Sequence, residues 1–60
     1  MNDLDTRVYA ELRKVPGRTR TLRKLKALTG ANSHAEVYGA LDRLWAAGKI
    51  NDHGVAKEGR

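Results

Sequence analysis

A chain of 60 residues makes one small domain, and because it contains no cysteine, neither disulfides nor a thiolate metal site can support the fold. Lysine and arginine number 12 against 7 for aspartate and glutamate, and the resulting net charge of +5 points to a polyanionic partner. No stretch is long and apolar enough for a membrane span or a signal peptide, so we expect a cytoplasmic protein without membrane association.

The first predicted helix covers about residues 3–15. Its apolar residues recur at intervals of four, four and three and form one stripe: Leu4, Val8, Leu12 and Val15. Asn2 or Asp3 can cap its start, because their side-chain oxygens can accept from the first backbone N–H groups. Pro16 and Gly17 should stop it, since proline cannot continue a helix.

Residues 17–21 (GRTRT) alternate arginine with threonine, which favours a short strand, although Thr21 could equally cap a helix. The second predicted helix covers about residues 21–29, and its inner face consists of Leu22, Leu25 and Leu28. Gly30 closes this helix, and the turn after it leads into a third. The two helices therefore form a helix-turn-helix unit.

The third predicted helix covers about residues 33–47, and its apolar stripe is Val37, Leu41 and Leu44. Ser33 can cap its start, and Glu36 can reach back to complete a capping box. Gly48 ends it, since a left-handed residue is needed just past the last turn. Residues 49–57 then predict a minimal hairpin wing, in which Val55 pairs back toward Ile50 across a turn.

The segment VYGALDRLWAAGKI, together with the leucine-rich helix and glycine turn before it, resembles bacterial winged helix-turn-helix transcription regulators. The similarity is to the pattern Thr-Val-Tyr-Arg-x-Leu of ferric-uptake-regulator and PadR-type proteins, with Glu36 in place of the threonine and Gly39 in place of the arginine. The resemblance implies a mainly α fold with three helices and a small β-hairpin wing, as one domain over residues 1–60. It also implies that Tyr38 faces the DNA major groove.

Seven basic residues and no acidic one lie in the segment from residue 13 to residue 26: Arg13, Lys14, Arg18, Arg20, Arg23, Lys24 and Lys26. In the resembling regulators the start of the second helix abuts the phosphate backbone. We therefore expect backbone contacts from Arg18, Arg20, Thr21, Arg23, Lys24 and Lys49. The alternative is a solvated basic face, which we favour less because so many unbalanced charges repel one another.

On the third helix, the base-facing edge is expected to consist of Ser33, His34, Tyr38 and Arg43. Alternatively, Tyr38 lies at the rim of the core or in a dimer contact. Trp45 is expected to pack at the core rather than touch DNA. A second hypothesis follows from the small side chains of Ala35, Gly39 and Ala46, which would let another protein dock on this face. The chain would then be an adaptor or inhibitor, such as a phage or mobile-element product.

The inventory of reactive side chains argues against an enzyme. Ser33 and His34 are adjacent on a helix, so their side chains diverge and cannot form a nucleophile and base pair. His34 and His53 are far apart in sequence, and no cysteine or tight carboxylate cluster accompanies them. We expect no catalysis, no metal, no cofactor and no small-molecule substrate.

These observations predict sequence-specific binding of double-stranded DNA by a small transcriptional regulator, associated with the nucleoid of a bacterial or phage-infected cell. A single module of this kind has a footprint of roughly 600–1,000 Å². Useful specificity therefore implies a homodimer on a two-fold site, or a partner protein beside it.

Overall fold

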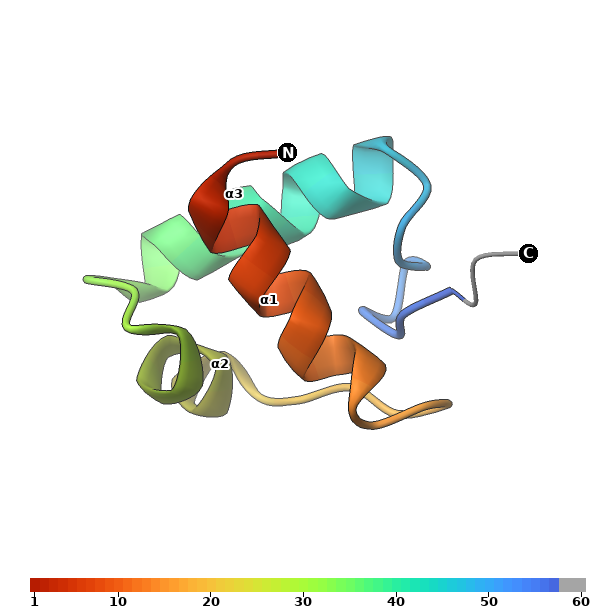
Figure 1. The fold of residues 1–60 in the computed structure, drawn as a ribbon, viewed down its shortest axis with the longest axis horizontal. Coiled ribbons are helices and arrows are strands. Elements are labelled where there is room, and N and C mark those ends of the chain that lie inside the picture. The colour runs from red at the N-terminus through yellow and green to blue at the C-terminus, as the bar shows by residue number, and fades with distance from the viewer. Residues whose placement is uncertain (58–60) are drawn as a thin grey trace.

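The computed structural model describes residues 1–57 and contains three helices: α1 (Asp3–Arg13), α2 (Leu22–Thr29) and α3 (His34–Ala46). Each helix packs against the other two. In Figure 1, α1 crosses in front of α3, α2 lies near the start of α3, and the chain after α3 returns toward the end of α1. The predicted mainly helical class is confirmed. Residues 58–60 of the predicted domain lie outside the described residues.

Each helix begins at a residue whose side chain caps it, as predicted. Asn2 Oδ1 accepts from the Asp5 N–H at 2.8 Å, Thr21 Oγ1 from the Lys24 N–H at 3.1 Å, and Ser33 Oγ from the Glu36 N–H at 3.2 Å. Glu36 also reaches back, but its carboxylate accepts from the Asn32 N–H at 2.8 Å rather than from that of Ser33. One orphan donor of α3, the Glu36 N–H, and the Asn32 N–H just before the cap are thus satisfied by local side chains.

The helix ends differ slightly from the predicted ones. Gly30 and Gly48 follow α2 and α3 with φ near 75° and 74°, the left-handed conformation that glycine adopts without a steric cost. The end of α1 lies two residues before the predicted one, at Arg13, because the Val15 N–H turns back to Leu12 O at 3.1 Å ahead of Pro16.

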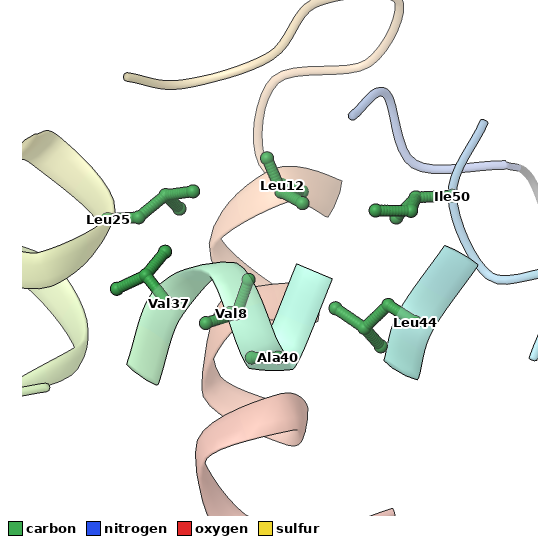
Figure 2. Packing of buried hydrophobic residues seen from close by; sticks show 7 residues of the cluster. All are labelled: Val8, Leu12, Leu25, Val37, Ala40, Leu44 and Ile50. Carbon is green, nitrogen blue, oxygen red and sulfur yellow. The ribbon is translucent and has the colours of Figure 1, made fainter. Parts of the chain in front are cut away.

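The core lies where the three helices and the chain after α3 meet. Its fully buried members, shown in Figure 2, are Val8, Leu12, Leu25, Val37, Ala40, Leu44 and Ile50. The core residues that α1 and α3 contribute are spaced by three or four positions, as the predicted apolar stripes of these helices require. Leu41 is only half-buried, and Ala40 takes the central place on α3.

Two predicted core positions are wrong. Leu28 is 44% exposed, and Thr29 is buried instead, with its hydroxyl donating to Leu25 O at 2.6 Å. The short α2 therefore turns Leu25 and Thr29 fully inward, with Leu22 half-buried beside the core as predicted, and leaves Leu28 at the surface. Trp45 is 58% exposed, since it follows Leu44 and so lies about 100° around the helix from it.

The wing is reduced to a turn held by a few hydrogen bonds. Ile50 and Ala56 form an isolated antiparallel bridge, and the flanking N–H groups of Asn51 and Lys57 donate to Val55 O and Lys49 O. Within residues 1–57 no strand forms on either side of this bridge or in the predicted stretch 17–21. That stretch lies beside the turn: a Cβ on Gly54 would come within 2.9 Å of Thr19 Oγ1.

None of α1, α2 and α3 is long and apolar enough to cross a lipid bilayer. The longest of the three helices, α3, has 13 residues.

Candidate nucleic-acid interface

The start of α2 is an exposed, cationic helix end. Its first turn contains no acidic residue, and Arg23 and Lys24 are its second and third residues after the Thr21 cap. The backbone N–H groups of this turn add the positive end of the helix dipole. Arg18, in the loop before α2, is exposed as well. We name Arg18, Arg23 and Lys24 the α2 basic cluster.

The members of the α2 basic cluster have no ion-pair partner among residues 1–57, and the same holds for Lys26. Arg18, Arg23 and Lys24 are also exposed, so the positive potential of the cluster is directed at solvent. An anionic ligand could bind here without first displacing an internal partner.

Arg20, which was expected to contact the DNA backbone, is instead bound to the end of α1. Its Nε donates to Glu11 O at 3.0 Å, its Nη2 lies 3.9 Å from Glu11 Oε1, and its side chain is only 20% exposed. Glu11 also pairs with Lys14 at 2.9 Å. Two of the seven predicted basic residues therefore balance one carboxylate and contribute little to the exposed field.

Lys49 lies beside α1. Its Nζ lies 6.0 Å from the centroid of the Tyr9 ring on α1, and Arg13 lies 5.6 Å from the same ring. The Tyr9 hydroxyl in turn donates to Lys57 O at 3.4 Å. The structure thus places Lys49 beside α1, the helix that also binds Arg20.

The predicted base-facing residues divide between two sides of α3. Arg43 points toward α1, where its Nε lies 2.9 Å from Asp5 Oδ2 and its Nη2 lies 2.9 Å from Asp5 Oδ1. These hydrogen bonds to Asp5 hold the pKa of Arg43 above its ordinary value. Tyr38 lies on another side and is 58% exposed. His34 is exposed at the start of the helix, and Ser33 is engaged as its cap.

An apolar groove lies along the side of α3 that carries Tyr38. We name it the aromatic groove: Tyr38, Leu41 and Trp45 line it from α3, Leu22 from α2, and residues 50–54 from the turn after α3. The sequence alone did not predict this groove, although Tyr38 and Trp45 are seven positions apart, a spacing that places both rings on one face of a helix. Its second wall comes from the turn, which no periodicity could locate.

Comparison of the chain with protein-family models, with curated proteins and with solved structures finds no match.

Proposed function

We propose that this protein binds double-stranded DNA, with the start of α2 on the phosphate backbone and the first half of α3 in the major groove. The observation that carries the proposal is the α2 basic cluster, whose three exposed cations have no ion-pair partner among residues 1–57. Phosphates bound there would also accept hydrogen bonds from the first turn of α2.

Base contacts fall in this proposal to the exposed side chains of His34 and Tyr38. Ser33 lies at the start of α3, and the start of a recognition helix is the part that enters the major groove. Ser33 would therefore lie close to the bases. Arg43 would reach a nearby phosphate only with the part of its guanidinium that Asp5 leaves open. Residues 49–57 would act as a short wing, and Lys49 would meet the backbone beside α1.

The proposed role is that of a small transcriptional regulator. One copy covers roughly 600–1,000 Å² of DNA, too little for high specificity. A homodimer on a two-fold site, or a partner protein on the adjacent DNA, would supply the remainder.

Fluorescence anisotropy of a labelled random-sequence duplex tests the backbone half of the proposal. We expect binding with an affinity on the order of micromolar at low salt that falls steeply as salt rises, because each neutralised phosphate releases counterions. Arg23→Ala should weaken binding to all sequences and flatten the salt slope by about one. No binding at low salt would refute DNA as the ligand.

Lys14→Ala is the matched control for Arg23→Ala. Both changes remove one positive charge, but Lys14 already pairs with Glu11 at 2.9 Å. A site at α2 requires that Arg23→Ala weakens binding more than Lys14→Ala does. Equal losses would indicate that only the net charge of the chain matters.

A further inference from the structure

The aromatic groove is apolar at its floor and acidic at its edge. Tyr38 and Trp45 leave 58% of their surfaces exposed beside half-buried Leu22 and Leu41. Asp42 and Asp52, both exposed, lie along the same groove. Contiguous exposed apolar surface that is rimmed by polar residues marks many protein and ligand binding sites.

The charge of the groove is opposite to that of the chain as a whole. Within residues 1–57, Asp42 has no ion-pair partner, and Asp52 has only His53, whose Nε2 lies 3.8 Å away. The chain carries a net charge of +5, but this groove has two exposed carboxylates beside its aromatic rings that form no ion pair with lysine or arginine of residues 1–57. A DNA backbone would be repelled from this part of α3, whereas a cationic partner would be attracted.

A second copy of the chain is a poorer occupant than a cationic partner. A two-fold axis through the groove would place Asp42 and Asp52 near the same residues of the other copy. The arginine that lines the groove, Arg20, is bound to Glu11 and forms no ion pair with Asp42 or Asp52. Like charges brought together at an interface disfavour that pairing.

We propose that the aromatic groove binds a peptide segment of a partner protein in which a large apolar side chain is flanked by lysine or arginine. The anchor inserts between Tyr38 and Trp45, and its basic neighbours pair with Asp42 and Asp52. Aromatic side chains with a polar rim are the usual centre of peptide and protein interfaces. The α2 basic cluster contributes none of the groove residues, whereas Tyr38 belongs to both proposals, so a bound peptide would exclude DNA bases from that ring.

A phage-displayed library of random linear peptides, selected on the immobilised full chain, tests the chemistry of the occupant. Enriched peptides should combine a leucine or phenylalanine anchor with lysine or arginine. Enrichment of acidic or uncharged peptides, or no enrichment, would overturn the proposal.

Labelled synthetic copies of the enriched peptides locate the site by anisotropy. Trp45→Ala should weaken their binding by on the order of tenfold or more, because loss of an aromatic anchor is among the costliest interface changes. Asp42→Lys should weaken it to a similar extent by charge reversal. Both side chains are exposed, so circular dichroism should show intact helices. Unchanged affinity in both variants would place the peptide elsewhere and refute the groove.

Arg23→Ala separates this proposal from the DNA proposal. Arg23 lies outside the groove, so its loss should spare peptide binding while reducing DNA binding. Trp45 is the single tryptophan of the chain, and its emission should shift to the blue when a peptide covers it. A similar shift produced by a DNA duplex, or by raising the protein concentration alone, would assign the groove to DNA or to a second copy and overturn the peptide.

Discussion

Arg43 on α3 and Asp5 on α1 form a two-point ion pair, with Nε–Oδ2 and Nη2–Oδ1 distances of 2.9 Å each. The Asp5 side chain is only 4% exposed and has Arg43 as its ion-pair partner, while half of the Arg43 side chain remains in contact with solvent. Gly39 permits the arrangement, since a Cβ there would come within 3.2 Å of Arg43 Nη1. A side chain expected to face DNA bases thus joins two helices.

Replacement of Arg43 should destabilise the domain, because it leaves the Asp5 carboxylate buried without its counter-charge. We expect Arg43→Met to lower the thermal midpoint by roughly 5–10 °C, measured by circular dichroism. The double variant Asp5→Leu with Arg43→Met should recover most of the loss, since an apolar pair of similar size needs no compensation. A single variant as stable as the parent would show that the pair contributes nothing to folding.

Leu25 and Leu28 should respond very differently to truncation, although both lie on the expected inner face of α2. Leu25 is fully buried, so Leu25→Ala should cost about 2–5 kcal/mol, enough to unfold much of a domain this small. Leu28 is 44% exposed, and Leu28→Ala should cost about 1 kcal/mol or less. Urea titrations of the two variants measure the difference, and equal losses would contradict the orientation of α2.

Arg20 and Arg23 form a matched pair for separating folding from binding. Arg20→Ala removes the hydrogen bond to Glu11 O and should lower the free energy of unfolding by about 1–2 kcal/mol. Arg23→Ala should leave stability within about 0.5 kcal/mol, because its side chain is exposed. Denaturant unfolding and DNA titration of both variants should give opposite rankings. A stable Arg20→Ala protein with reduced DNA affinity would restore Arg20 to the DNA contacts.

Tyr38→Ala should alter the preference among DNA sequences more than the overall affinity. A base contact changes discrimination, whereas a phosphate contact changes all affinities alike. The measurement is a selection from a pool of random duplexes, carried out with the parent, Tyr38→Ala and Arg23→Ala proteins. It compares the sequence preferences of the three proteins. Identical enriched sequences from the parent and Tyr38→Ala would remove Tyr38 from base recognition.

The sequence by itself determined the three helices and most of their ends. The helix ends depend on hydrogen bonds and backbone angles within about four residues. They are the caps at Asn2, Thr21 and Ser33 and the left-handed glycines Gly30 and Gly48. The same local periodicity indicated the buried stripes of α1 and α3. Such features can be predicted because the residues that decide them are neighbours in the chain.

Only the tertiary structure decided how the charged and aromatic side chains are used. Asp5 and Arg43 are 38 positions apart, and nothing in the sequence around either one indicates the other. The burial of Thr29 in place of Leu28 likewise depends on how α2 packs. The wall of the aromatic groove opposite Trp45 depends on how the turn after α3 packs. A helical pattern specifies which residues share a face, but the packing of one helix against another selects which face is covered.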